Sequence, residues 1–157
     1  MSFFPSHSEV LVSSLSKEEV MERLDLVTKD ANFLEFDLRE NQGYQFNGTL
    51  AEDSFRLSLV ITKADSFLPL IKGKLEATPK GSILFLRYKL FPGSIFFLGF
   101  WSVVTVLLAI FFALVAGKYI FSGISLAVGF GNYLFAWNHF KRKIRVSQEI
   151  FHGLLNI

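Results

Sequence analysis

Residues 94–116 read SIFFLGFWSVVTVLLAIFFALVA, a run of 23 residues without a single charged side chain. A helix rises about 1.5 Å per residue, so this segment is long enough to span the roughly 30 Å hydrocarbon core of a bilayer. Strands are seldom this long. A domain within a chain of 157 residues is also too small to surround such a helix on every side. We therefore predict that residues 94–116 form a transmembrane helix.

A second uncharged stretch, residues 119–137, follows after a short link that contains Lys118. A single helix through both stretches would overshoot the bilayer, because about 20 residues already span its hydrocarbon core. We therefore predict a transmembrane hairpin over residues 94–137, with antiparallel spans at about 94–116 and 119–137. The apolar share of the whole chain, 51% of its residues, agrees with a membrane protein.

The charged residues are unevenly distributed around this hairpin. Residues 1–90 carry 11 Lys and Arg against 13 Asp and Glu, whereas residues 91–157 carry 5 against a single Glu. Cytoplasmic flanks of membrane spans are enriched in Lys and Arg, and the hairpin tip has only Lys118. We therefore expect both termini in the cytoplasm. The residues expected to contact lipid head groups and set this topology are Lys141, Arg142, Lys143 and Arg145, and the expected interface anchors are Trp101 and Trp137.

The first 90 residues show the alternating pattern of β-strands. Apolar side chains recur at every second position in four successive segments that are joined by short links. This pattern predicts an antiparallel meander with one apolar face and one solvated face. The four segments are 44–50, 55–61, 71–77 and 84–90, and two further strands are expected at 8–14 and 33–39.

Helical patterns occur at two places outside the hairpin. Ser16 followed by Glu19 fits a capping box, and apolar residues at helical spacing come after it, so we predict a helix over 16–29. Residues 141–155 also show an apolar stripe and are expected to form a last helix. That helix would either lie on the membrane or return to cover the sheet, and the second arrangement is favoured.

These elements together predict an α+β fold. It consists of an antiparallel β-meander covered by one or two helices, with a two-helix transmembrane hairpin inserted before the C-terminal helix. Three regions are expected: a cytoplasmic α+β domain over 1–91, the hairpin over 94–137, and a basic juxtamembrane segment with the C-terminal helix over 138–157.

Small residues recur at every fourth position in both spans, a spacing that lets helix backbones approach closely in lipid. Self-packing of the hairpin is the favoured interpretation, and docking of a partner or a second copy is the alternative. In the self-packed arrangement Gly117 would lie near Gly123, Ala113 near Ala127, and Ala109 near Gly131. The complete helix-packing set is Thr105, Ala109, Ala113, Gly117, Gly123, Ala127 and Gly131.

Two polar residues lie near the predicted cytoplasmic end of the second span. Asn132 is the one clearly polar side chain at depth in that span, and we expect it to make a structural hydrogen bond across helices, worth about 1 kcal/mol. His139 lies within the basic segment, and we expect it to be solvated at the interface.

The loop before the third strand of the meander is unusual because two large apolar residues, Phe67 and Leu68, precede Pro69 in a polar link. The favoured interpretation is that these side chains plug the edge of the sheet. The alternative is a finger that touches the membrane or a partner, since loops with exposed apolar tips often bind.

Several classes of function lack a sequence signal. Cysteine is absent, which excludes disulfides and thiolate chemistry, and no basic leader with an apolar run opens the chain, so no signal peptide is expected. The basic charge lies beside the most apolar segment, which argues against nucleic-acid binding. No nucleophile, phosphate-loop or zinc-protease motif occurs. We therefore expect no enzymatic activity, no catalytic residues, no metal and no cofactor.

The segments YQFNGTL (44–50), SFLPLIKGKL (66–75) and GSILFLRYKL (81–90), followed by a hairpin and a basic tail, carry a resemblance. Together they resemble small uncharacterised bacterial membrane proteins with a strand-rich cytoplasmic domain before two spans. The resemblance covers most of the chain and implies an architecture and a bacterial source, for which we expect a location in the inner membrane. It implies no activity and assigns no residue a role.

The function expected from all of these features is that of a non-enzymatic accessory or scaffolding subunit in a larger inner-membrane complex. Its expected partners are membrane lipids and other membrane-protein subunits or a second copy of itself. The alternative is a membrane-anchored lipid-binding or lipid-handling module, because a curved meander closed by helices can hold an apolar ligand.

Overall fold

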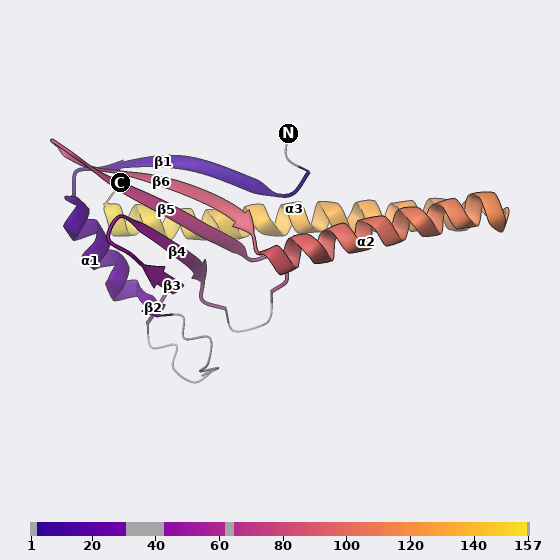
Figure 1. Cartoon of the computed structure of the whole chain (residues 1–157), viewed down its shortest axis with the longest axis horizontal. Coiled ribbons are helices and arrows are strands. Elements are labelled where there is room, and N and C mark those ends of the chain that lie inside the picture. The colour runs from indigo at the N-terminus through magenta and orange to yellow at the C-terminus, as the bar shows by residue number, and fades with distance from the viewer. Residues whose placement is uncertain (1–2, 31–42, 62–64, 157) are drawn as a thin grey trace.

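The computed structural model describes residues 3–30, 43–61 and 65–156. Its strands are β1 (Ser6–Ser13), β2 (Thr28–Asp30), β3 (Phe46–Leu50), β4 (Ser54–Leu59), β5 (Pro69–Thr78) and β6 (Gly81–Leu90). Its helices are α1 (Lys17–Val27), α2 (Pro92–Ile110), the π-helical turn η1 (Phe111–Val115) and α3 (Tyr119–Leu155). The predicted α+β fold is confirmed, since one mostly antiparallel sheet is combined with helices that follow its strands (Figure 1).

The six strands form a single sheet in the order β1-β6-β5-β4-β3-β2. The predicted meander is confirmed as β3 to β6, with each strand antiparallel to the next. The strand expected at 8–14 is β1, which pairs antiparallel with β6 over its whole length. The first strand of the chain therefore lies beside the last one, and β6 is an interior strand immediately before the membrane hairpin.

The first helix begins where it was predicted and ends earlier. Ser16 and Glu19 form the reciprocal capping box, and Val20 and Leu24 are buried against the sheet. The helix stops at Val27, because the backbone of Thr28 is already extended and starts β2, a strand that the sequence pattern did not reveal. β2 pairs with β3 in the parallel direction. The strand expected at 33–39 lies outside the described residues.

The most consequential difference from the predicted fold is that α3 is one continuous helix of 37 residues. The expected break between the second span and a separate C-terminal helix is wrong, because no proline or glycine interrupts the stretch from Tyr133 to His152. The helix leaves the hairpin and runs along the inner face of the sheet (Figure 1). The favoured interpretation, that the C-terminal helix covers the sheet, is confirmed.

The hydrophobic core lies between the sheet and the second half of α3. The ring of Phe151 stacks on Phe46 and Phe55, with centroid distances of 5.2 and 6.1 Å. Burial of one such ring stabilises the fold by about 1.5–3 kcal/mol. The other buried positions of this half of α3 follow helical spacing and are Phe140, Ile144, Ser147 and Leu155.

Polar contacts fix α3 to the first and last strands. The buried phenol of Tyr88 on β6 donates to Glu9 Oε1 at 2.5 Å, and the side-chain amide of Gln148 donates to Glu9 Oε2 at 2.6 Å. Burial, together with the hydrogen bond and the negative charge of Glu9, raises the pKa of Tyr88. Near the helix end, Arg23 of α1 donates to the carbonyl oxygen of Leu154 at 2.7 Å. The helix is therefore held by hydrogen bonds as well as by apolar packing.

The hairpin extends beyond the sheet as two antiparallel helices (Figure 1). At its tip the α-helical pattern of α2 widens into η1, and Gly117 then adopts a left-handed conformation with φ of +64°. A residue with a Cβ atom would be strained there, so glycine suits the position where the chain reverses.

Candidate functional site at the base of the hairpin

Two helices are long and apolar enough to span a membrane. The segment Pro92–Val115 has a mean hydropathy of 2.6 in its most apolar window, and α3 reaches 1.4. Only 11% of the window in Pro92–Val115 and 6% of the window in α3 are buried inside the protein. The core helix of a soluble domain is, in contrast, mostly buried. Neither helix lies at the N-terminus, where a signal sequence would be found. These features support a membrane location.

The two spans pack through small and hydroxyl side chains. Ser122 of α3 donates from Oγ to the carbonyl oxygen of Ala109 at 2.8 Å. About two turns further along α3, Gly129 lies against Thr105, where an added Cβ would come within 2.4 Å of the hydroxyl oxygen. Gly129 is therefore a point of close approach between the two helices, as small residues allow in lipid.

This packing uses a different face of the second span from the predicted one. Gly123, Ala127 and Gly131 are all exposed, and an added Cβ at either glycine would meet nothing within 4 Å. On the first span Thr105 and Ala109 are buried as expected, Ala113 is half-buried and Gly117 is exposed. The expected pairs Gly117–Gly123, Ala113–Ala127 and Ala109–Gly131 are thus replaced by Ala109–Ser122 and Thr105–Gly129.

A second stripe of small residues on the second span matches the observed packing. Ser122, Ser125 and Gly129 are spaced by three and four residues and lie on the half-buried side of α3. The rotation of a helix about its own axis depends on the geometry of the tip, which small-residue spacing does not specify. Whether the exposed stripe of Gly123, Ala127 and Gly131 docks a partner stays a prediction.

Asn132 is half-buried on α3. Among the described residues it makes no side-chain hydrogen bond to α2, so the cross-helix bond expected for it is not seen there. The hydroxyls of the first span bond within their own helix instead: Ser102 donates to the carbonyl of Leu98 and Thr105 to that of Trp101.

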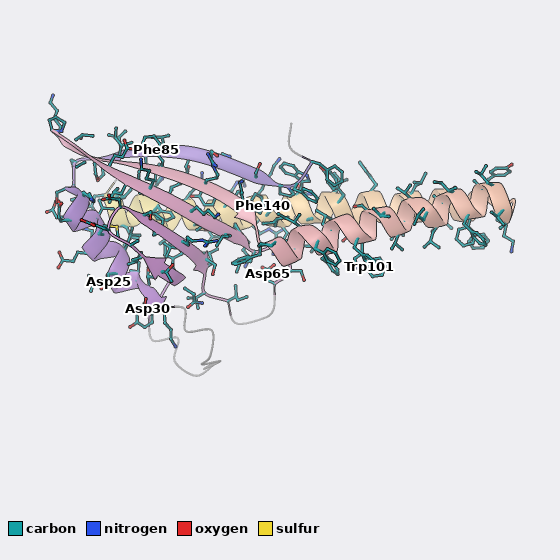
Figure 2. All side chains as sticks on the ribbon, viewed as in Figure 1. Asp25, Asp30, Asp65, Phe85, Trp101 and Phe140 are labelled. Carbon is teal, nitrogen blue, oxygen red and sulfur yellow. The ribbon has the colours of Figure 1, made fainter. Side chains whose placement is uncertain are left out.

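The base of the hairpin, where α2 and α3 leave the sheet, brings together a cluster of charged side chains. Asp65 accepts a hydrogen bond from His139 Nε2 at 2.7 Å, and Lys143 Nζ lies 3.5 Å from the same carboxylate oxygen. Figure 2 shows Asp65 beside the start of α2. The expectation of a solvated His139 is therefore wrong, because its side chain is only 22% exposed and is paired with a carboxylate.

The environment of Asp65 favours its charged form. Burial alone would raise the pKa of this carboxyl group, but the hydrogen bonds from His139 and from the Phe67 amide, together with the charges of His139 and Lys143, lower it overall. Asp65 therefore remains an anion at neutral pH. One of the four cations expected at the lipid head groups, Lys143, is thus directed toward the protein.

The loop after Asp65 packs between the two helices of the hairpin. Phe67 and Leu68 are 5% and 6% exposed, so this apolar pair is buried as the favoured interpretation requires, although Phe67 contacts the hairpin helices and its packing at the edge of the sheet stays a prediction. The Phe67 ring contacts Phe97 of α2 and Phe135 of α3, each at a centroid distance of 6.2 Å. The loop therefore connects the strand-rich domain to both membrane helices.

The N-terminal segment packs on the opposite flank of the same base. The Tyr133 hydroxyl donates to the carbonyl oxygen of Phe3 at 2.7 Å, and their rings lie 5.2 Å apart. Tyr133 also contacts Trp137, and Lys141 Nζ lies 5.6 Å from the Trp137 ring, within reach of a cation–π interaction. Aromatic and basic side chains thus surround the point where the helices leave the domain.

The remaining cations and the first tryptophan of the predicted interface set are exposed, and their contact with lipid stays a prediction. Lys141, Arg142 and Arg145 are exposed on α3, and Trp101 is 43% exposed on α2 (Figure 2). In the part of the chain that the structure describes, no three His, Asp or Glu side chains are grouped so as to hold a metal ion.

No protein-family model, curated protein or solved structure matches the chain. The resemblance to small bacterial membrane proteins therefore stays a prediction.

Proposed function

We propose that this protein is a non-enzymatic accessory or scaffolding subunit of a membrane complex, one that holds a cytoplasmic α+β domain in a fixed position relative to its membrane helices. The observation that carries the proposal is the continuity of α3, which passes from the hairpin into the hydrophobic core without a break. A flexible tether would serve an enzyme that only needs a membrane anchor, whereas a continuous helix transmits position and orientation.

The base of the hairpin supports the same role. Phe67 contacts both membrane helices, and the Asp65 carboxylate bonds His139 of α3. These contacts restrain bending of α3 at the junction, because bending would separate the rings and break the hydrogen bond. The loop and the continuous helix α3 therefore both hold the domain against the hairpin.

The proposed orientation places the domain and both termini in the cytoplasm of a bacterial cell. It rests on the exposed cations Lys141, Arg142 and Arg145 at one end of the hairpin and the single Lys118 at the other. Reporter domains fused after the C-terminus and inserted at Lys118 should report opposite sides of the membrane. Two reporters on the same side would contradict the hairpin.

The experiment that tests the scaffolding role is extraction in a mild detergent, followed by sizing and mass spectrometry of the intact complex. We expect other membrane subunits to co-purify in fixed stoichiometry. Recovery of the chain alone, with stoichiometric lipid bound to it, would contradict the proposal and favour the lipid-handling alternative. The stacked rings of Phe46, Phe55 and Phe151 already fill the space between sheet and helix where such a lipid would lie.

A further inference from the structure

The outer face of the sheet, which points away from α3, carries a row of cations. The register of the strands places Arg87 of β6 directly opposite Lys72 of β5, and Lys72 directly opposite Arg56 of β4. All three are exposed. Like charges directly opposite one another destabilise a sheet, so this row is unfavourable for folding unless something else compensates it.

Neighbouring acidic groups do not compensate this row within the described residues. Lys74, one pleat further from the membrane, has its Nζ 2.7 Å from Glu76 Oε1, but neither Lys72 nor Arg87 has a described carboxylate within ion-pair distance. The two cations are therefore available to an anion from outside.

A hollow with a volume of about 420 Å³ lies at this place, and we call it the outer basic hollow. The side chains that border it on the outer face are Lys72, Lys74, Arg87, Ser8, Val10 and Phe85. Phe85 is 39% and Val10 56% exposed, and Figure 2 shows Phe85 at the β1–β6 edge of the sheet. Glu9 also borders the hollow, but its carboxylate accepts hydrogen bonds from Tyr88 and Gln148 on the opposite, inner side.

We propose that the outer basic hollow binds a phosphate monoester with a small apolar body. A guanidinium group matches phosphate oxygens through paired hydrogen bonds, and a lysine ammonium adds a point charge. Arg87 and Lys72 thus balance the two negative charges of the phosphate, and the Ser8 hydroxyl can donate a hydrogen bond. The apolar body lies on Phe85 and Val10. The volume is within the range of small-ligand sites.

Two sources could supply this phosphate, a soluble ester or a lipid head group. Arg87 is three residues before Leu90, where β6 ends at the hairpin, which corresponds to roughly 10 Å along a strand. The head-group layer adds only about 5–7 Å beyond each side of the hydrocarbon core. This separation favours a soluble ester.

The test uses the full-length protein in nanodiscs of phosphatidylcholine, titrated calorimetrically with phenyl phosphate and with inorganic phosphate. We expect phenyl phosphate to bind more tightly than inorganic phosphate, because its ring contacts Phe85. The double variant Lys72→Gln/Arg87→Gln should bind phenyl phosphate at least tenfold more weakly, since each lost hydrogen bond to a charged group is worth roughly a factor of ten or more. Phe85→Ala should remove the preference for phenyl phosphate and leave inorganic phosphate unaffected.

The matched control is Lys80→Gln, which removes one exposed cation at the turn between β5 and β6, outside the hollow. It should bind phenyl phosphate like the wild type. The double variant is expected to fold, because it removes a repulsion between facing strands, and circular dichroism checks this. Equal binding by the wild type and the folded double variant, or an equal loss in Lys80→Gln, would overturn the proposal.

A second arm identifies the source of the phosphate. Nanodiscs that contain phosphatidic acid, a lipid with a phosphate monoester head group, are titrated with phenyl phosphate in the same way. Weaker apparent binding in these discs, abolished in the double variant, supports a head group as the ligand. Unchanged binding supports a soluble ester. Absence of any binding of phenyl phosphate in either disc would refute the phosphate site itself.

Discussion

The two halves of α3 form one uninterrupted helix in two different environments. From Tyr119 to Trp137 its large apolar side chains are mostly exposed, and a single narrow strip faces α2. From Phe140 to Leu155 the reverse holds, because most apolar positions are buried or half-buried against the sheet, and the exposed positions other than Val146 and Gly153 are charged or polar. An apolar stripe on a helix therefore marks a protein interface only where the surrounding medium is water. In lipid, small and hydroxyl residues mark the interface instead.

The sharpest way to test this comparison is to remove one phenylalanine from each half. Phe151→Ala should destabilise the domain by about 3–5 kcal/mol, because the ring is fully buried between Phe46 and Phe55. Phe130→Ala removes a ring that is 64% exposed in the membrane half and should leave domain stability unchanged. Urea unfolding in detergent micelles, followed by near-ultraviolet circular dichroism, measures both. Equal losses would show that the two halves do not differ as described.

The junction between the halves is tested by Asn138→Pro. Asn138 is exposed inside α3, and proline in a helix interior removes a hydrogen bond and clashes with the preceding turn, at a cost of about 3 kcal/mol. We expect the helix to bend there and the distance between spin labels at Lys118 and Lys80 to become broadly distributed. Asn138→Ala is the control and should keep a narrow distribution. A narrow distribution in the proline variant would mean that α3 does not set the position of the domain.

The charged cluster at the junction predicts a dependence of stability on pH. The pKa of Asp65 is lowered in the folded protein, so its contribution is complete above the unfolded value of about 3.9 and is lost as the pH falls through the folded value. Asp65→Asn should reduce the free energy of unfolding at pH 7 by about 1.5–3 kcal/mol. The difference between variant and wild type should shrink in acid. A difference that stays constant between pH 7 and pH 2 would argue against the ion pair.

Two glycines in the membrane half of α3 test which face of this helix packs against α2. Gly129→Leu should separate α2 from α3 and cost about 1–3 kcal/mol, because its side chain would collide with Thr105. Gly131→Leu adds the same side chain where nothing lies within 4 Å and should be neutral for hairpin stability. Cysteine cross-linking between positions 109 and 122 reports the packing of the hairpin in each variant. A larger effect at Gly131 would support the originally predicted face.

The features that could be predicted from the sequence are those with a local signal. Alternation at 44–50, 55–61, 71–77 and 84–90 indicated β3 to β6, and the uncharged stretches indicated the hairpin, because each pattern depends only on neighbouring residues. The capping box at Ser16 is local in the same sense.

The features that the sequence did not reveal depend on contacts between distant residues. Asp65 and His139 are 74 positions apart, and neither stands in a motif that predicts the other. The row formed by Arg56, Lys72 and Arg87 becomes visible only when the strand register is known. The continuity of α3 was missed because the cations after Trp137 were interpreted as a boundary, although lysine and arginine are good helix formers.

The burial of Phe140, Ile144 and Phe151 in the domain core also determines when the protein can finish folding. These residues leave the ribosome after both spans, so every strand of the sheet is synthesised before the helix that covers it. At about 5–20 residues per second, the sheet waits several seconds with its inner face uncovered. Folding of the strand-rich domain can therefore be completed only after both spans have been synthesised. Interruption of synthesis before α3 is complete would leave an open sheet, which is prone to aggregate, rather than a folded domain.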